Sequence, residues 1–255
     1  MSRFLIGVYW KNRVSTLKEF ASLTKKILSS LQNLNIEFTE FELVGNAPGS
    51  VFKITDDLGN LSELIYNHAL DNTQIYSSTD INGDPTWEAT TELGYNIIIQ
   101  NGKDPSSGGI TLAITAGMFN SDVVNSITLR FPKEKYLTKE TRQLFDYSIT
   151  KDTILAFVTE ANPAFGYVMV PNFSECISAE GRTDVGWLTY IKNSNASAMR
   201  NNPDLIAAGI EMEPVSIGGT LFSIDREMVS PDNEVQVARA KLLRAKLMEN
   251  HLIDS

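Results

Sequence analysis

The sequence contains few of the side chains that carry nucleophilic or metal chemistry. Its 255 residues include only two histidines, His68 and His251, and one cysteine, Cys176. A single cysteine excludes an internal disulfide and a multi-thiolate zinc site within one chain. His251 lies close to the C-terminus, where chains fray, and His68 falls on the apolar stripe of a predicted helix. A half-buried structural histidine is therefore favoured over a general base at His68.

Recognisable catalytic motifs are also absent from the sequence. It contains no Walker phosphate loop, dinucleotide-binding glycine fingerprint, HExxH zinc motif or GxSxG nucleophile elbow. The segment 80–84 imitates a calcium loop, but Pro85 occupies the glycine position and Thr91 stands where the bidentate glutamate belongs. A turn is favoured there. We therefore predict a protein that is not an enzyme and that holds no metal or cofactor.

Long hydrophobic runs are missing as well. No run approaches the ~18–20 apolar residues that a membrane-spanning helix needs. Residues 1–10 resemble a secretion signal only faintly, because Lys11 and Arg13 follow where small cleavage-site residues are expected. We interpret this segment as a strand. We expect no membrane partner and predict a cytoplasmic location.

The sequence contains fewer basic than acidic residues. The chain has 31 acidic and 22 basic residues, a net charge of −9 and a pI of about 4.8. Proteins that bind nucleic acid need clustered cations, so we do not expect nucleic acid as a direct ligand. The same imbalance would speed the encounter with a basic protein partner, although solubility alone would also account for it.

The apolar residues that are present follow helical spacing in several segments. They predict a helix over 15–34 capped by Ser15, and a second helix after Asn60, in a capping-box-like sequence. A C-terminal helix is predicted to start at Ser230, with proline at its first position. Its apolar stripe comprises Val235, Ala238, Leu242, Ala245 and Met248.

Segments 110–116 and 127–131 alternate apolar and polar residues, which indicates strands with one solvent-facing side, and segment 95–100 is a nearly continuous apolar run. Strands are predicted over 4–10, 95–100, 110–116, 127–131, 165–170, 185–191, 206–213 and 220–224. We therefore predict an α+β fold, with mainly antiparallel sheet packed with amphipathic helices, in a single domain over 1–255. The order of elements suggests a diverged duplication with halves 1–136 and 137–255, although no residue-level repeat supports it.

The polar segment 71–92 is predicted to be a loop with an interaction surface. It combines Asp80, Asp84, Glu88 and Glu92 with Trp87. Acidic side chains around an aromatic anchor suit docking to a cationic protein surface. The alternative is a solvated loop whose tryptophan folds back onto the body of the protein.

Short aromatic and glycine motifs occur in a characteristic order along the chain. They are Tyr9-Trp10, Leu93-Gly94, Asn101-Gly102, Gly117, Asn125, Leu129-Arg130-Phe131-Pro132, Gly186-Trp187-Leu188-Thr189-Tyr190 and Gly218-Gly219-Thr220, followed by the C-terminal helix. This order resembles the bacterial immunity protein family fifty-two, which is found in polymorphic-toxin and type VI secretion loci. The resemblance spans most of the chain.

The resemblance implies a non-enzymatic antitoxin that binds the C-terminal catalytic domain of a toxin encoded beside it. Toxins linked to the family often resemble restriction-endonuclease-fold nucleases, so a basic partner and occlusion of its active site are expected. Trp10 and Trp187 are expected in the core rather than at an interface. The predicted toxin-binding residues are Asp80, Asp84, Trp87, Glu88 and Glu92.

Two other functions stay open at this point. A hydrolase that uses dispersed carboxylates would require a deep pocket holding several carboxylates with perturbed pKa values. A scaffold or secretion adaptor would give no protection against a neighbouring toxin. The oligomeric state is also open, because the stripe on the C-terminal helix could pack on its own body or on a second copy.

Overall fold

The computed structural model describes residues 3–70, 74–103, 108–119, 124–177 and 185–253. The chain divides into two compact units. The first unit comprises residues 9–130, and the second comprises residues 1–8 together with 131–255. The single domain over 1–255 and its halves, 1–136 and 137–255, stay predictions.

The first unit is built on five strands in the order β3-β2-β4-β5-β6. They are β2 (Glu42–Val44), β3 (Val51–Lys53), β4 (Tyr95–Gln100), β5 (Thr111–Ala116) and β6 (Asn125–Arg130), and every neighbouring pair is antiparallel. Ile97, Ile114 and Ile127 share one rung and are all buried. The alternation predicted over 110–116 is therefore confirmed in β5, whereas Thr128 of β6, which was predicted to face solvent, is buried. Strand β4 alternates buried and exposed residues although its sequence is a nearly continuous apolar run.

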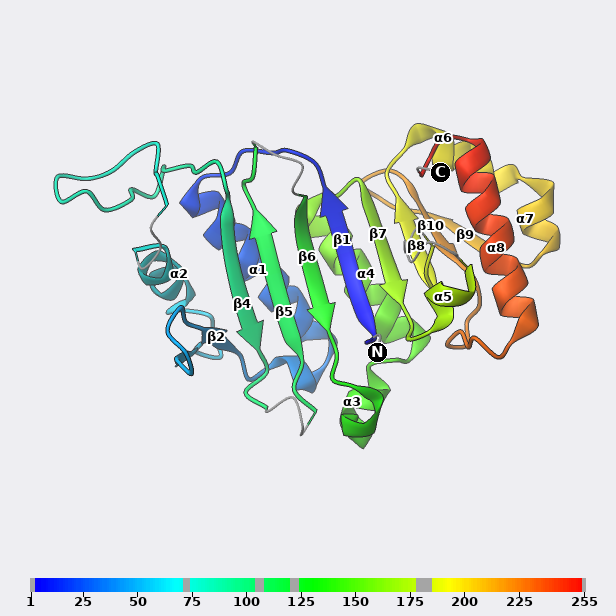
Figure 1. Cartoon of the computed structure of the whole chain (residues 1–255), viewed down its shortest axis with the longest axis horizontal. Coiled ribbons are helices and arrows are strands. Elements are labelled where there is room, and N and C mark those ends of the chain that lie inside the picture. Colours follow the sequence, from blue (N-terminus) through cyan, green and yellow to red (C-terminus); the bar gives the residue numbers. More distant parts are fainter. Residues whose placement is uncertain (1–2, 71–73, 104–107, 120–123, 178–184, 254–255) are drawn as a thin grey trace. The chain divides into compact units, whose positions relative to one another are not determined.

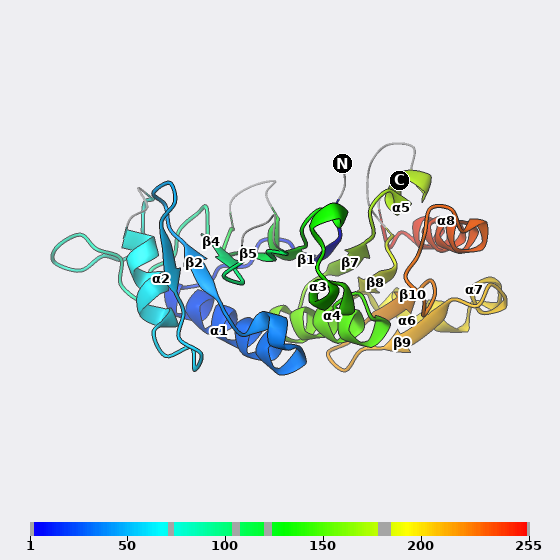
Figure 2. The same ribbon diagram turned by 90° about the horizontal axis from the view of Figure 1, so that it is seen from below.

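Helix α1 (Leu17–Leu34) covers one face of this sheet, as Figure 2 shows. Its N-cap is Thr16 rather than the predicted Ser15. The Thr16 hydroxyl accepts a hydrogen bond from the Glu19 backbone N–H, and the Glu19 carboxylate accepts one from the Thr16 N–H. This reciprocal capping box satisfies two N–H groups that the helix itself cannot pair.

Helix α2 (Leu61–Leu70) also belongs to the first unit, and η1 (Ile36–Phe38) follows α1. The predicted capping role of the Asn60 side chain is wrong. Its carboxamide oxygen accepts from the Thr55 N–H at 2.9 Å, and its amide donates to the Lys53 carbonyl oxygen at 3.0 Å. Asn60 therefore closes the turn that leads from β3 into α2. His68 is half-buried, as predicted.

The second unit orders its strands β1-β7-β8-β10-β9, and Figure 1 shows them beside helix α4. They are β1 (Leu5–Trp10), whose first four residues belong to this unit, β7 (Phe165–Met169), β8 (Leu188–Ile191), β9 (Glu211–Pro214) and β10 (Thr220–Ser223). The pairs β7–β8, β8–β10 and β10–β9 are antiparallel. The α+β class predicted from the sequence is confirmed.

The helices of the second unit are mostly short, apart from α4 and α8. They are η3 (Glu134–Tyr136), α3 (Lys139–Gln143), α4 (Tyr147–Ala161), α5 (Phe173–Ile177), α6 (Ser194–Ala198), η4 (Met199–Asn201), α7 (Pro203–Ala207) and α8 (Glu234–Glu249). Figure 2 shows α4 and α8 on opposite faces of the strands of this unit. No helix among the described residues is both long and apolar enough to cross a membrane.

The predicted strand over 206–213 is wrong in its first half, because residues 203–207 form α7. The Asn202 side chain accepts hydrogen bonds from the Asp204 and Leu205 N–H groups, and Pro203 occupies the first helical position. Asparagine followed by proline is a helix-start signal that outweighed the apolar run after it.

Helix α8 differs from its prediction in both its start and its buried face. It begins after Asn233, whose side chain accepts from the Val235 and Gln236 N–H groups, and not after Ser230. The buried residues are Gln236, Ala240, Leu243 and Leu247, whereas Val235 on the predicted stripe is 61% exposed. The burial of Gln236 explains the error. Its amide accepts from the Ser230 N–H and donates to Asp225, so a polar residue lies on the core side.

The motif residues 186–190 lie in the core of the second unit, as expected. Trp187 is fully buried, and its indole N–H donates to the Asp225 carbonyl oxygen at 2.8 Å. A Cβ atom on Gly186 would lie 2.2 Å from the Val168 carbonyl oxygen, so only glycine fits there. Trp10 in the first unit is also buried. The expectation that both tryptophans serve the fold is confirmed.

Candidate functional site

Acidic residues accumulate in one part of the first unit. No lysine or arginine occurs between Lys53 and Lys103. The same stretch contains eight acidic residues: Asp56, Asp57, Glu63, Asp71, Asp80, Asp84, Glu88 and Glu92. Residues 54–102, which we call the acidic segment, therefore carry a charge of −8 in a chain whose net charge is −9. The predicted interaction surface covers only residues 71–92 of this run, whereas the absence of lysine and arginine marks the whole of it in the sequence.

Residues 74–91, between α2 and β4, form a loop without strands, as predicted, and hydrogen bonds link its two legs in the manner of a hairpin. Figure 1 shows it extending away from α2. The Ser77 N–H donates to the Thr90 carbonyl oxygen, the Thr86 N–H donates to the Ser78 carbonyl oxygen, and Thr79 pairs with Pro85 in an antiparallel bridge. Side chains repeat these links: the Thr90 hydroxyl donates to Ser77 and the Thr86 hydroxyl to Ser78. We call residues 74–91 the acidic hairpin.

The tip of the acidic hairpin is a tight turn over 80–84. The Asp80 carboxylate accepts from the backbone N–H groups of Asn82 at 2.8 Å and Asp84 at 3.1 Å. The Asp80 N–H donates to the Asp84 carbonyl oxygen, and Gly83 takes a positive φ of 88°. The turn that was favoured over a calcium loop is therefore present. Among the described residues, no group of three or more side chains could hold a metal ion.

The base of the acidic hairpin is joined to both helices of the first unit. The carbonyl oxygens of Trp87 and Ala89 accept hydrogen bonds at 3.0 Å from the N–H groups of Lys18 and Leu17, the first residues of α1. The Trp87 ring lies 5.2 Å from the ring of Tyr66 on α2. These contacts use N–H groups that a helix start leaves unpaired, so they hold the hairpin in a defined orientation.

The structure places all five predicted toxin-binding residues in this region. Asp80 is exposed and Asp84 half-exposed at the tip, while Glu92 is exposed just beyond the hairpin. Glu88 forms a salt bridge with Lys18 at 3.6 Å, and both side chains are largely exposed, so the pair contributes little stability. Trp87 is half-buried against α2. Their contact with a toxin stays a prediction.

Sequence reasoning missed the exposed apolar residues of the same segment. Ile81 at the tip is 101% exposed, Ile75 is 91% exposed and Leu93 is 61% exposed. These are the three highest values among the large apolar side chains that the structure describes, with Val235 equal to Leu93. Hydrophobic periodicity could not predict their exposure, because isolated apolar residues in a polar loop have no periodicity.

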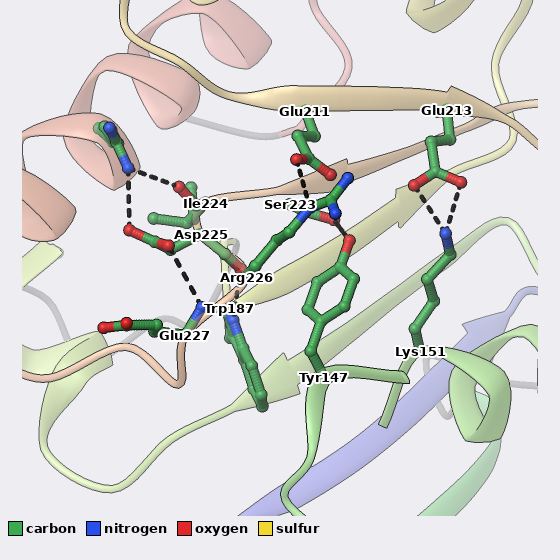
Figure 3. Close-up of polar contacts among 11 residues, drawn as sticks. Tyr147, Lys151, Trp187, Glu211, Glu213, Ser223, Ile224, Asp225, Arg226 and Glu227 are labelled. Carbon is green, nitrogen blue, oxygen red and sulfur yellow. Dashed lines mark hydrogen bonds and ion pairs between the residues drawn. The ribbon is translucent and has the colours of Figure 1, made fainter. Parts of the chain in front are cut away.

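A second cluster of charged residues lies over β9 and β10 in the second unit, shown in Figure 3. Lys151 on α4 contacts both carboxylate oxygens of Glu213, at 2.6 and 2.7 Å. Arg226 binds Glu211 at 2.7 Å. Arg239, on α8, binds Asp225 at 2.9 Å. Glu211, Glu213 and Asp225 therefore each have a cationic partner within the unit.

The cluster also contains a pair of hydroxyl groups beside a lysine, a combination that can carry acid–base chemistry. The Tyr147 phenol lies 2.9 Å from the Ser223 hydroxyl. Burial raises the pKa of Tyr147, which disfavours the phenolate. Burial alone would lower the pKa of Lys151, but the hydrogen bond and charge of Glu213 outweigh it and raise that pKa. Both groups therefore keep their protons near neutral pH, which does not suit a general base.

A hydrolase would require a deep pocket that holds several carboxylates with perturbed pKa values. Three hollows run along α8 and are lined by Cys176, Ala208, Val235, Leu242, Arg244 and Met248, among others. Their only carboxylates belong to Glu234 and Glu249. The carboxyl groups with clearly lowered pKa values, Asp57 and Asp146, are exposed and hydrogen-bonded within their own turns. Neither of them lines these hollows.

The comparisons with known proteins agree with this structure. The chain matches the family model of Immunity protein 52 (Imm52) over residues 2–255. It shares its fold with the Pseudomonas aeruginosa T6SS protein PA0821, at a TM-score of 0.51 and 11% sequence identity, covering 94% of this chain and 72% of that chain. No curated protein matches the sequence. Because the family match spans essentially the whole chain, the protein belongs to the Immunity protein 52 family.

Proposed function

We propose that the protein binds and neutralises the C-terminal catalytic domain of a cognate toxin, and that this domain is a basic, nuclease-type domain. Membership of an immunity family supports the immunity role. The observation that carries the rest is the acidic segment, where eight acidic residues occur without a lysine or arginine. A nuclease must bind phosphates through cations, so such a surface would match its substrate channel.

The proposed mechanism is stoichiometric occlusion. The acidic segment attracts the toxin domain through long-range electrostatics and covers the channel that would otherwise hold nucleic acid. Because the toxin's target would be inside the cell, we place this binding in the cytoplasm. Self-protection must outlast toxin synthesis, so we expect a dissociation constant on the order of nanomolar or lower.

Co-expression tests the proposal. The toxin gene next to this one supplies the catalytic domain, which is expressed alone, with this chain, or with an unrelated acidic protein of similar charge. We expect growth only in the presence of this chain. Continued killing in its presence would reject the immunity role for that toxin.

A titration with purified proteins separates binding from catalysis. Toxin-domain activity is measured while this chain is added in increasing amounts. A binding inhibitor removes activity in proportion to its concentration, with an end point at equimolar amounts. Complete inactivation by a small fraction of an equivalent would indicate an enzyme that modifies the toxin, and would overturn the proposed mechanism.

A further inference from the structure

Two independent properties coincide in the acidic hairpin. The first is charge: the segment around it lacks lysine and arginine entirely. The second is the exposure of large apolar side chains, which is higher at Ile81 and Ile75 than at any other described position. Single exposed apolar residues are ordinary on protein surfaces. A fully exposed aliphatic side chain on a tight turn that begins at Asp80 and ends at Asp84 is a more specific arrangement.

The exposed isoleucine is also held in place. The Asp80 carboxylate closes the turn by accepting hydrogen bonds from two backbone N–H groups. The two legs of the hairpin are linked where Ser77 pairs with Thr90 and where Thr79 pairs with Pro85. A side chain presented on an ordered backbone loses less conformational entropy on binding than one on an irregular loop. The free protein therefore already displays Ile81 in a fixed position.

We propose that Ile81 is the apolar anchor of the toxin complex, and that it enters an apolar depression on the toxin domain whose rim carries lysine or arginine. This inference rests on the proposed function and names the contact within it. The carboxylates on either side of Ile81 would face the cationic rim, while the isoleucine supplies the buried contact at the centre. Interfaces commonly concentrate their binding energy in such a desolvated anchor surrounded by polar contacts.

The charge of the acidic segment indicates which kind of partner contacts Ile81. A second copy of this chain would bring two segments of −8 together, which electrostatic repulsion opposes. A basic domain meets the same segment with opposite charge. Trp87 is a weaker candidate for the anchor, because its ring already packs on Tyr66 and its carbonyl oxygen binds the Lys18 N–H.

Substitution of Ile81 tests the inference without disturbing the fold, because its side chain is fully exposed in the free protein. The probe is the purified catalytic domain of the neighbouring toxin. Binding is measured for the wild type, Ile81→Ser, Ile81→Leu and the control Ile206→Ser, which changes an isoleucine of α7 that is 56% exposed. All four proteins should unfold at the same temperature.

We expect Ile81→Ser to weaken binding by about tenfold to a hundredfold, mainly through faster dissociation. Ile81→Leu should bind nearly as well as the wild type, and Ile206→Ser should bind equally well. Wild-type affinity in Ile81→Ser, or an equal loss in Ile206→Ser, would overturn the inference and leave the proposed function standing.

Two further results would show that the toxin domain does not bind at Ile81. If the wild type itself does not bind the toxin domain, the proposed function fails and the inference fails with it. Sedimentation of the free proteins tests whether a second copy of this chain, and not the toxin domain, binds the hairpin tip. A wild-type dimer that Ile81→Ser converts to monomers would show that the hairpin tip docks on a second copy, and would also overturn the inference.

Discussion

The protein contains two acidic regions that differ in how their charges are balanced. In the second unit, Glu211, Glu213 and Asp225 lie within salt-bridge distance of a cation of the same unit. The acidic segment itself contains eight acidic residues and no lysine or arginine. Glu88 pairs with Lys18 of α1, but among the described residues neither Asp80 nor Asp84 has a salt-bridge partner. Balanced charges complete the protein's own fold, whereas accumulated charge of one sign raises the potential that a partner meets.

We therefore expect changes in the core of the second unit to affect stability, and changes in the acidic segment to affect toxin binding. The largest effect on stability should come from Trp187→Ala. It removes a fully buried ring and its hydrogen bond to the Asp225 carbonyl oxygen, so we expect a loss of about 3–5 kcal/mol in the free energy of unfolding. Chemical denaturation measures this loss. A change below about 1 kcal/mol would contradict the role given to Trp187.

The next effect concerns the rate of toxin association. Asp84→Lys reverses a tip charge, and Asp80→Asn removes one while it keeps an oxygen that can accept the turn's two backbone hydrogen bonds. We expect the double variant to associate about tenfold more slowly at low ionic strength. The difference should shrink as salt screens the charges. Stopped-flow kinetics at several salt concentrations checks this, and equal rates at low salt would remove the tip from the binding site.

A smaller effect should come from the N-cap of α4. The Asp146 carboxylate accepts hydrogen bonds from the Ser148 hydroxyl and backbone N–H, and these bonds lower its pKa. Because the folded-state pKa is depressed, this stabilisation is present above the ordinary aspartate pKa and is lost as the pH falls through the lowered value. Asp146→Ala should therefore cost about 1 kcal/mol near pH 7 and progressively less in acid. Denaturation across pH measures the difference, which should not grow on acidification.

The smallest effect should come from the salt bridge between Lys151 and Glu213. The Glu213 side chain is 42% exposed, so solvent screens the pair and we expect its coupling energy to be about 0.5 kcal/mol. A double-mutant cycle with Lys151→Met and Glu213→Gln measures it. Toxin affinity should be the same in all four proteins. A tenfold loss of affinity would place the cluster of Figure 3 at the interface with the toxin and would contradict the assignment of binding to the acidic segment alone.

Much of the fold could be predicted from the sequence because its signals are local. The strict alternation in β5 predicted its buried face, and the apolar spacing of α1 predicted its core side. The face of α8 could not be predicted. Gln236 is buried through hydrogen bonds to Ser230 and Asp225, so the tertiary structure overrides the apolar stripe that includes Val235.

The candidate site was predictable only in part for a related reason. The acidic residues and Trp87 of the loop are visible in the sequence, but the cross-links that turn the loop into a hairpin are not. They join residues such as Ser77 and Thr90, which have no distinctive spacing. The position of Ile81 at an ordered tip depends on those links. Exposure of an isoleucine is a property of the folded chain, so only the structure could show it.

Hydrogen exchange on the complex locates the surface of this chain that the toxin domain covers. Backbone exchange of this chain is measured alone and with a saturating amount of the cognate toxin domain. We expect strong new protection within residues 74–93, at the hairpin tip and base, and little change in α7 and α8. Protection confined to α7, α8 or the β9–β10 region, with unchanged exchange in residues 74–93, would contradict it.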